Sequence, residues 1–466
     1  DSAAAPAEPP RAGLRDRVRR GGFWSLVGYA ASFVIRLASN LLLTRLLPQD
    51  LFGTANLGQT LLSAMAMFTD IGLRPFLVQS SQGERPEVMD TLWTIQILRG
   101  FGIGIMTLVL ATGLWALQHF GVISAATAFG DGRLPLFVAV LAVVPCIGGF
   151  ESTRTAEAQR TLHIRPLMVS NLSSQLISTA VLLLVAYLTH SLWSMLLAGV
   201  VSALSSVALS HFYLRGHSNR LHIDRDIVGT LKAFSRWIML SSIVGYFANS
   251  MDKLVLGAMS SSRTLAIYSV AATAATLLTD ALGKLLGDVA LPAFSEIARD
   301  RPADLRRAHY RFRMPLEVAA WLCAGALMAA GPALIGLLYD RRYAEAGPML
   351  QLLALSIPAL RYRVTTALLL ATGDSRVQFR QAAASALVAA ISAVIGYSVA
   401  GVQGFLVGIS LAPWLASSAS IHRAHTLGLI DWFGEIRLLP LLLVGYAAGV
   451  GGAQLLAVTL KSGLRV

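Results

Sequence analysis

The sequence predicts an all-α polytopic membrane protein, and its composition and hydropathy pattern both point to that class. Hydrophobic residues make up 55% of the 466 residues, charged residues make up 14%, and the mean hydropathy is +0.62. Soluble domains carry about a quarter charged residues, so this chain has too few charges to cover a water-facing surface. Apolar stretches of about 20 residues recur along the whole chain, and each is long enough to cross ~30 Å of hydrocarbon as a helix. An ordinary soluble enzyme is therefore excluded.

Thirteen transmembrane helices are predicted, with short loops between them. An Ala- and Pro-rich tail, residues 1–20, precedes the first and is expected to be disordered and cytoplasmic. The predicted spans are residues 22–47, 51–73, 89–117, 134–153, 166–189, 192–214, 236–259, 265–292, 314–338, 347–371, 378–400, 404–421 and 438–460.

The orientation follows from the distribution of Lys and Arg between alternate loops. Of the 38 basic residues, 25 fall on the side of the N-terminus, seven on the other side and six within predicted spans. Cytoplasmic loops carry the excess of basic residues, so we expect a cytoplasmic N-terminus. The net charge of +13 then reflects topology, and no nucleic-acid partner is expected.

Two long cytoplasmic connections, 215–235 and 295–313, interrupt the otherwise short loops. The first follows six spans and predicts an N-terminal six-helix lobe (21–215), an inter-lobe linker (216–235), a C-terminal six-helix lobe (236–425), and a further linker with a thirteenth helix (426–466). Val27-Gly28-Tyr29 with Arg36 matches Val244-Gly245-Tyr246 with Lys253, and Phe68-Thr69-Asp70 matches Leu278-Thr279-Asp280. Six-span halves start and end on one side, so the lobes would be parallel repeats with substrate between them near the midplane.

Charged residues inside the predicted spans are the candidate functional residues. A basic residue at the centre of a membrane helix costs ~2.5–3.5 kcal/mol, so these side chains must face protein or a water-filled cavity. Asp280, Lys284 and Asp288 lie along one helical stripe, whereas the adjacent Asp252 and Lys253 point in different directions. The basic residues are Arg36, Arg99, Lys253, Lys284, Arg361 and Arg363, and the acids that could pair with them or couple transport to an ion are Asp70, Asp252, Asp280 and Asp288.

In a shared cavity the basic residues would form a graded track across the membrane, which suits a phosphate or pyrophosphate. A cavity role is favoured for Arg36 and Arg99, because no acid lies three or four residues away. Asn40 and Asn249 are polar companions for Arg36 and Lys253, or interhelical hydrogen-bonding residues. Structural ion pairs and snorkelling stay open as alternatives, above all for Lys284. Arg361 and Arg363 are two residues apart, so only one should line a cavity unless Pro358 breaks the helix.

Catalytic and metal-binding motifs do not occur in the sequence. There is no Walker A loop, no His-Glu-x-x-His and no Gly-x-Ser-x-Gly, and Cys146 and Cys323 both lie in apolar runs. We therefore expect no enzyme activity, no metal, no disulfide and no cofactor.

Several motifs resemble the polysaccharide-transport branch of the multidrug/oligosaccharidyl-lipid/polysaccharide exporter superfamily, the Wzx-like flippases. The resemblance covers almost all of residues 15–425. The segments that carry it, in chain order, are Leu46-Leu47-Pro48-Gln49-Asp50-Leu51-Phe52-Gly53, Thr69-Asp70-Ile71-Gly72-Leu73, Asn249-Ser250-Met251-Asp252-Lys253, Tyr268-Ser269-Val270-Ala271, Leu291-Pro292-Ala293-Phe294-Ser295, Tyr343-Ala344-Glu345-Ala346 and Ala371-Thr372-Gly373-Asp374.

The resemblance implies two six-helix lobes in a V, a cationic central cavity and an undecaprenyl-diphosphate-linked oligosaccharide as cargo. It implies transport from the cytoplasmic to the periplasmic leaflet of a bacterial inner membrane by alternating access. Arg36, Arg99, Lys253 and Lys284 are the expected head-group contacts. Family members usually have twelve or fourteen spans, so the thirteen predicted here differ from the family pattern. The difference affects the C-terminal end of the chain and leaves the two lobes intact. Expected partners are the lipid-linked oligosaccharide, membrane lipids, and polysaccharide polymerase and chain-length proteins; proton, sodium or membrane potential stays open as the driving force.

Two other functions are weighed against a flippase. A cation-coupled multidrug antiporter of the same superfamily would require a cavity with mainly acidic side chains, whereas the charges in these spans are mostly basic. A membrane-embedded glycan polymerase or ligase would want catalytic residues on a sizeable periplasmic loop, and the predicted outer loops are short.

Overall fold

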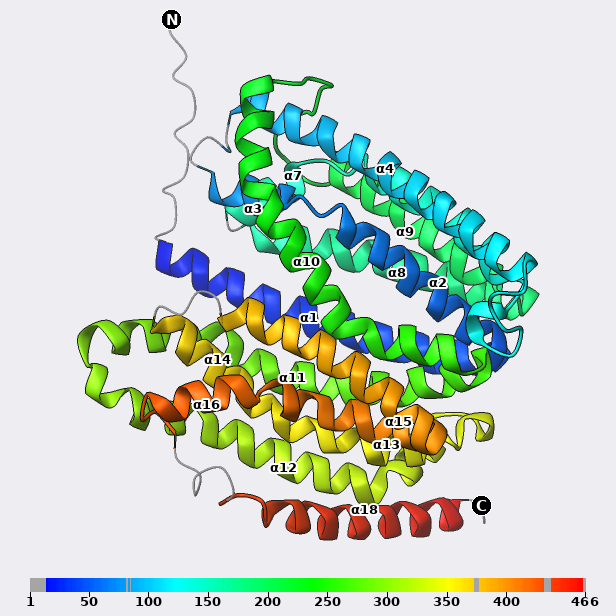
Figure 1. Ribbon diagram of the computed structural model, residues 1–466. Helices are drawn as coiled ribbons and strands as arrows, with labels where there is room; N and C mark the ends of the chain where they lie inside the picture. The colour runs from blue at the N-terminus through cyan, green and yellow to red at the C-terminus, as the bar shows by residue number, and fades with distance from the viewer. Residues whose placement is uncertain are drawn as a thin grey trace, which may run out of the picture. The chain divides into compact units, whose positions relative to one another are not determined.

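The computed structural model describes residues 14–80, 83, 85–161, 163–372, 377–430 and 437–463, and the regular structure within these ranges is helical (Figure 1). Its first half contains α1 (Leu14–Leu46), α2 (Gln49–Phe68), α3 (Leu73–Gln79), α4 (Pro86–His119), η1 (Ala128–Gly130), α5 (Leu134–Leu141), α6 (Val143–Gly148), α7 (Arg154–Arg160), α8 (Ile164–Thr189) and α9 (Trp193–Phe212). The second half contains α10 (Arg225–Met259), α11 (Ser262–Asp300), η2 (Pro302–Asp304), α12 (Leu305–Leu338), η3 (Arg341–Tyr343), α13 (Ala346–Leu353), η4 (Ala354–Leu360), α14 (Arg361–Ala371), α15 (Val377–Ala416), α16 (Ser418–Thr426) and α18 (Leu441–Gly463).

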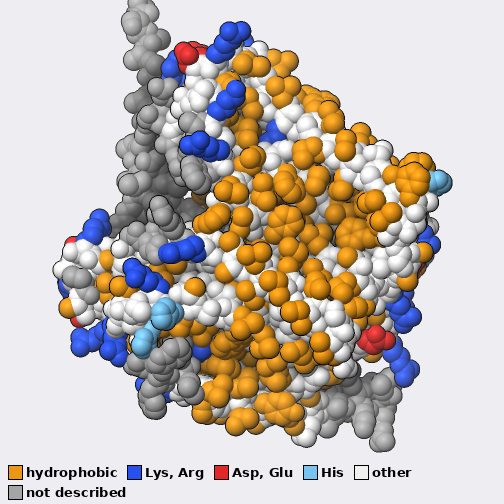
Figure 2. All heavy atoms as spheres, in the orientation of Figure 1, with side chains coloured by type: hydrophobic (Ala, Val, Ile, Leu, Met, Phe, Trp, Pro, Cys, Tyr) orange, Lys and Arg blue, Asp and Glu red, His pale blue; other side chains and the backbone are white. Residues whose placement is uncertain are grey.

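The predicted class, an all-α polytopic membrane protein, is confirmed. Among the described residues, seven helical segments are long and apolar enough to cross a membrane, and two shorter apolar helices accompany them. Each predicted span overlaps helical residues, although 134–153 and 347–371 each cover more than one helix. The spans 236–259 and 265–292 fall on α10 and α11, which carry five of the ten charged candidates. Many large hydrophobic side chains are exposed, such as Val109 at 65% and Leu443 at 72%, and Figure 2 shows how densely such side chains cover one face. Such a surface suits contact with lipid.

Three helices continue beyond the spans that hydropathy marks. α10 begins at Arg225 and not near 236, α11 runs to Asp300, and α12 begins at Leu305. Much of the predicted linker 216–235 and of the connection 295–313 is therefore helical. Hydropathy detects only the apolar part of a helix, whereas the backbone hydrogen bonds continue into the polar part.

The helix α15 is broken into two parts, as the separate spans 378–400 and 404–421 predict. Ala400 and Gly401 have non-helical backbone angles, and the φ of 57° at Gly401 is one that glycine adopts without strain. The two parts then approach closely, because a Cβ added at Gly396 would lie 2.2 Å from the carbonyl oxygen of Gly404. Glycine therefore makes both the turn and the close approach possible.

The C-terminal helix α18 packs along α12 (Figure 1). Glycines line this contact: a Cβ at Gly325 would lie 2.2 Å from the carbonyl oxygen of Leu442, and one at Gly445 would lie 2.4 Å from that of Leu322. Small residues that let two backbones approach are typical of helix association in membranes. The predicted thirteenth helix is thus docked onto the helices before it.

The contacts divide the chain into two compact units. Unit 1 comprises Asp1–Leu46, Met65–Thr112 and Leu136–Met239, and unit 2 comprises Leu47–Ala64, Gly113–Pro135 and Leu240–Val466. The helices α2, α4 and α10 each contribute residues to both units. The lobe boundaries expected from the sequence, 21–215 and 236–425, stay a prediction.

A hydrophobic core in unit 2 fixes the helices that surround the candidate site. Phe294 of α11, Leu316 of α12 and Leu368 of α14 are buried together, with Leu360 at the end of η4. Burial of this kind contributes about 1.5–3 kcal/mol per large side chain. The core thus holds α14 against α11 and α12.

Candidate functional site

A cavity of about 760 Å³ lies within unit 2, among α10, α11, α14 and α15. Most of its polar lining is uncharged. Among the described lining residues Arg363 is the one basic side chain and Asp252 is the one acid. The polar lining residues are Asn249, Asp252, Thr279, Ser356, Tyr362, Arg363, Thr366, Gln378, Gln381, Ser385 and Ser417.

Arg361 and Arg363 face opposite sides of α14. Arg363 is exposed and lines the cavity, whereas the side chain of Arg361 is 4% exposed and lies behind the cavity wall. Two residues turn about 200° around an α-helix, so the sequence expectation that only one of the pair faces a cavity fits this placement. Pro358 lies in the 3-10 segment η4, just before α14 begins. The cavity candidate Arg361 therefore does not line this cavity, whereas Arg363 does.

Arg361 is held by a buried carboxylate. Its Nη1 lies 2.5 Å from Oε1 of Glu317, and Nε of Arg313 lies 2.9 Å from Oε2 of the same residue. All three side chains are at most 4% exposed. Two cations on one carboxylate leave an excess positive charge, so neighbouring groups must stabilise it.

Aromatic rings surround the guanidinium of Arg361. Its central carbon lies 4.8 Å from the ring centroid of Tyr362, 5.1 Å from that of Trp414 and 5.7 Å from that of Trp321. Such cation–π contacts stabilise a desolvated charge by about 2 kcal/mol. Nη2 of Arg361 also donates a hydrogen bond of 2.7 Å to the hydroxyl of Tyr362, which itself lines the cavity. Arg361 thus supports one cavity wall from behind.

Asp252 and Asn249 line the cavity from α10. The hydroxyl of Tyr268 donates a hydrogen bond of 2.5 Å to Oδ2 of Asp252, and Oδ1 is buried without a hydrogen-bond partner among the described residues. Asn249 donates to the carbonyl of Gly245 at 2.6 Å. Lys253 is half-buried, is not among the lining residues, and has no hydrogen bond or ion pair to the part of the chain that is described.

Two glutamine side chains complete the polar lining on α15. Gln381 donates from Nε2 to the hydroxyl of Ser417 at 3.3 Å and accepts from Ser420 at 2.8 Å. These serines fix the orientation of the amide. Gln378 is exposed one turn earlier on the same helix.

Arg99 and Asp70, two candidates far apart in the sequence, come together within unit 1. Nη2 of Arg99 lies 3.8 Å from Oδ1 of Asp70 and donates to the carbonyl of Ala66 at 3.0 Å. Ala66 lies in the last turn of α2, where carbonyls lack helical partners and favour a cation. Arg99 is therefore tied to the end of α2, with its side chain 23% exposed.

The remaining candidates lie apart from these contacts. Arg36 is exposed on α1 and has no hydrogen bond or ion pair within the described residues, and Asn40, one turn later, is half-buried. Asp280 is exposed on α11. Lys284 and Asp288 lie on α11, but their side chains are outside the described residues.

The sequence reasoning missed the groups that hold Arg361. Glu317 is an acid inside the predicted span 314–338, four residues from Arg313, and this spacing was a detectable signal. Trp321 and Trp414 carry no such signal, because aromatic residues are common in membrane helices. The two glutamines of α15 were missed because only charges inside the spans were weighed.

A second polar cluster in unit 2 joins the turn between α1 and α2 to η3. The side-chain amide of Gln49 donates to the carbonyl of Arg342 at 2.5 Å, and the rings of Phe52 and Tyr343 meet edge to face. Nearby, Thr54 donates to Oδ2 of Asp131 at 2.6 Å. Burial raises the pKa of Tyr339 to about 12 and that of Tyr343 above its usual range, so both phenols stay protonated at neutral pH.

The cavity presents one guanidinium, one carboxylate and several neutral hydrogen-bonding groups to a polar ligand. Arg363 can donate two parallel hydrogen bonds to a phosphate, and the amides and hydroxyls can pair with sugar hydroxyls. No group of three or more metal-ligating side chains occurs among the described residues.

The chain was compared with families and known proteins. A family model described as "Polysaccharide biosynthesis protein" matches residues 42–348. The succinoglycan biosynthesis transport protein ExoT of Rhizobium meliloti (strain 1021) is 24% identical over 341 residues, which are 73% of this chain and 66% of that protein. The chain thus spans slightly less than two thirds of that relative.

Solved structures share the fold at low identity. The lipid II flippase MurJ in an inward closed conformation matches 95% of this chain and 100% of its own, with a TM-score of 0.66 and 11% identity. An inward-facing multidrug resistance MATE transporter matches 88% of this chain and 95% of its own, with a TM-score of 0.64 and 14% identity. At these identities the likeness shows the fold alone.

Proposed function

Because this chain belongs to the polysaccharide biosynthesis protein family, we propose that it is a flippase for an undecaprenyl-diphosphate-linked oligosaccharide. We propose that it moves this lipid from the cytoplasmic to the periplasmic leaflet of a bacterial inner membrane, with its N-terminus in the cytoplasm. The names of the relatives support the class of cargo. One is a transport protein of succinoglycan biosynthesis, and a protein of the same fold flips lipid II.

The observation that carries the proposal is the composition of the cavity. One guanidinium, Arg363, and one carboxylate, Asp252, stand among neutral amides and hydroxyls. A pyrophosphate needs fixed cations to offset its loss of hydration, and sugars need many neutral hydrogen-bonding partners. A volume of about 760 Å³ lies within the usual range of small-molecule sites, and the head group with its first sugars would occupy it.

We propose that transport proceeds by alternating access. In this mechanism the head group crosses the membrane in a polar cavity while the polyprenyl chain stays in the bilayer. Arg36, Arg99 and Lys253 remain candidates for further contacts with the pyrophosphate, and Lys284 remains a candidate from the sequence. Polymerase and chain-length proteins would act on the delivered lipid, and a proton, a sodium ion or the membrane potential would drive the cycle.

A multidrug antiporter is the second candidate, and Asp252 is the observation that favours it. This acid lines the cavity, and one of its oxygens is buried without a hydrogen-bond partner among the described residues. A lipophilic cation would seek such a carboxylate. Arg363 in the same cavity would oppose the cation, so we prefer the flippase. A glycan polymerase or ligase has less support, because the predicted outer loops are short.

Binding by the purified protein tests the proposal. A fluorescent undecaprenyl-diphosphate-linked sugar should bind, and Arg36→Gln and Lys253→Gln should each weaken it about ten- to a hundredfold, the size of a buried charge-assisted contact. The two effects should nearly add if the contacts are independent. Tight binding of a lipophilic dication that survives both substitutions would favour the antiporter instead.

A further inference from the structure

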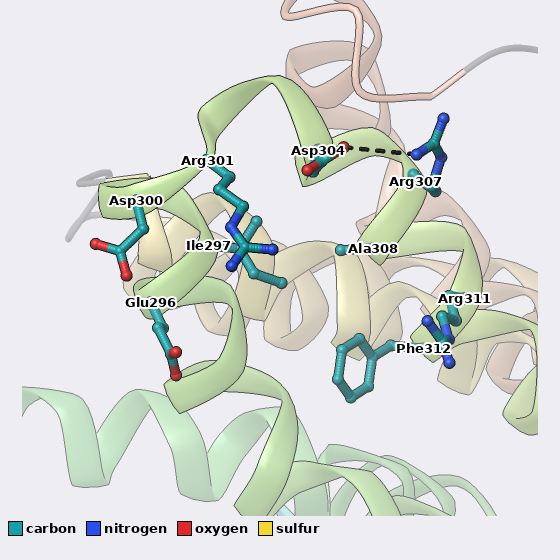
Figure 3. Close-up of a pocket in the computed structure, with 9 residues that line it drawn as sticks. All are labelled: Glu296, Ile297, Asp300, Arg301, Asp304, Arg307, Ala308, Arg311 and Phe312. Atoms are coloured by element: carbon teal, nitrogen blue, oxygen red, sulfur yellow. Dashed lines mark ion pairs between the residues drawn. The ribbon is translucent and has the colours of Figure 1, made fainter.

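A second hollow, of about 590 Å³, lies where α11 ends and α12 begins (Figure 3). It is distinct from the polar cavity and is built from the last turn of α11, the 3-10 turn η2 and the first two turns of α12. Ile297, Ala308 and Phe312 give it an apolar floor, and six charged side chains stand around that floor.

The charges around this hollow are separated by sign. Glu296 and Asp300 lie one turn apart on α11, and Arg307 and Arg311 lie one turn apart on α12. In Figure 3 these two acids are on one side and these two arginines on the other, with Arg301 between them and the third acid, Asp304, beside Arg307. A ligand that fills the hollow would therefore meet carboxylates at one end and guanidinium groups at the other.

Most of these charges have no partner among the residues that the structure describes. Arg307 lies 3.7 Å from Asp304, and this is an exposed ion pair. Within the described part of the chain, Glu296, Asp300, Arg301 and Arg311 have neither an ion pair nor a side-chain hydrogen bond. Side chains of both signs are therefore available to a ligand.

The depth of the hollow indicates its ligand. The adjoining predicted spans end at 292 and begin at 314, so the lining residues lie about 3 to 15 Å beyond the hydrocarbon at 1.5 Å per residue. The head-group layer occupies about 5–8 Å on each side of a bilayer. The part of the hollow nearest the spans, with Glu296, Ile297, Arg311 and Phe312, therefore lies at the depth of the lipid head groups.

We infer that this hollow binds the head group of a zwitterionic phospholipid with a primary amine, phosphatidylethanolamine. The phosphate would lie against Arg301 and Arg311, the ammonium against Glu296 and Asp300, and the upper acyl chain on Ile297 and Phe312. An anionic lipid would leave the two carboxylates facing its phosphate, and a choline head group has no N–H donor to give them.

Native mass spectrometry of the full-length protein with defined lipids tests this inference. Phosphatidylethanolamine should be retained in preference to phosphatidylglycerol and phosphatidylcholine. Glu296→Gln with Asp300→Asn should lower its binding about tenfold and leave phosphatidylglycerol unchanged or bound better. Arg301→Gln with Arg311→Gln should lower the binding of both lipids. Each charge is partly exposed, so single substitutions should give only about three- to fivefold effects.

Arg299→Gln is the matched control, because Arg299 is an exposed basic residue on α11 that does not line the hollow. This substitution should not change the binding of any of these lipids. Equal retention of phosphatidylglycerol, or phosphatidylethanolamine binding that survives both double substitutions, would overturn the inference. If soluble phosphoethanolamine bound as well as phosphatidylethanolamine, the hollow would recognise the free head group and the proposal of a membrane lipid as its ligand would be wrong.

Discussion

Arg361 forms a buried ion pair with Glu317, at 2.5 Å between Nη1 and Oε1, while Arg363 two residues later lines a polar cavity. One turn of helix thus carries two arginines in opposite environments. The first is enclosed by a carboxylate and aromatic rings, and the second is exposed to whatever occupies the cavity. This contrast separates a structural charge from a binding charge, and the two should respond differently to the same substitution.

Arg361→Gln should destabilise the protein. The substitution removes a buried charge-assisted hydrogen bond to Glu317, which is worth about 1.5–3 kcal/mol, while Arg313 still compensates the charge of that carboxylate. Thermal unfolding of the purified protein in detergent should show a clearly lowered Tm for this variant and an unchanged Tm for Arg363→Gln. If Arg361→Gln unfolded at the wild-type Tm, the contact between Arg361 and Glu317 would not contribute to the stability of the protein.

Arg363→Gln should weaken cargo binding without loss of stability. The guanidinium is the one basic group among the described cavity residues, so its loss should lower the affinity for an undecaprenyl-diphosphate-linked sugar about ten- to a hundredfold. Equilibrium binding to the purified protein measures this. Arg423→Gln, at an exposed arginine that does not line the cavity, is the control and should bind normally. Equal affinity for the Arg363 variant and the wild type would remove this residue from the site.

Gly53→Val should block transport by preventing a close helix contact. A Cβ at Gly53 would lie 1.8 Å from the carbonyl oxygen of Ser262, so α2 and the start of α11 could not approach as they do. We expect normal insertion and lost complementation of a transporter deletion. Gly132→Val is the control, because a Cβ there meets nothing within 4 Å. Full complementation by Gly53→Val would show that this contact is dispensable.

The predicted orientation can be tested with single cysteines at two exposed alanines. After Cys146 and Cys323 are replaced by Ser, a cysteine at Ala303 should be protected from an impermeant maleimide in intact cells, and one at Ala344 should react. The expectation rests on the excess of basic residues on the side of 295–313. Labelling of position 303 from outside would reverse the topology.

Hydropathy predicted the long membrane helices, since only helices of about 20 apolar residues satisfy their backbone groups within lipid. It also predicted the break near Gly401. It did not predict the short helices α3 and α7, which lie between predicted spans. It did not predict that α10, α11 and α12 continue into polar sequence, because their extra turns carry no apolar signal. Arg99 and Asp70 were both identified, but their pairing joins α4 to the end of α2 and depends on tertiary packing.

The candidate site was predicted less completely than the fold. Charges inside spans are unusual enough to be found one by one, and Asn249 and Asp252 do line the cavity. Which of Arg361 and Arg363 faces it depends on the rotation of α14, and periodicity alone does not determine that rotation. Gln378 and Gln381 are neutral, and neutral polar residues are too common in membrane helices to identify a cavity.

Leaflet exchange in reconstituted vesicles tests the central claim most directly. Purified protein would be placed in liposomes with a fluorescent undecaprenyl-diphosphate-linked oligosaccharide, and an impermeant quencher would report how much lipid changes leaflet. We predict rapid exchange with the wild type, slower exchange with Arg363→Gln, and the wild-type rate with Arg423→Gln. Exchange no faster than in protein-free vesicles, while the same vesicles move a lipophilic dication, would contradict the flippase account.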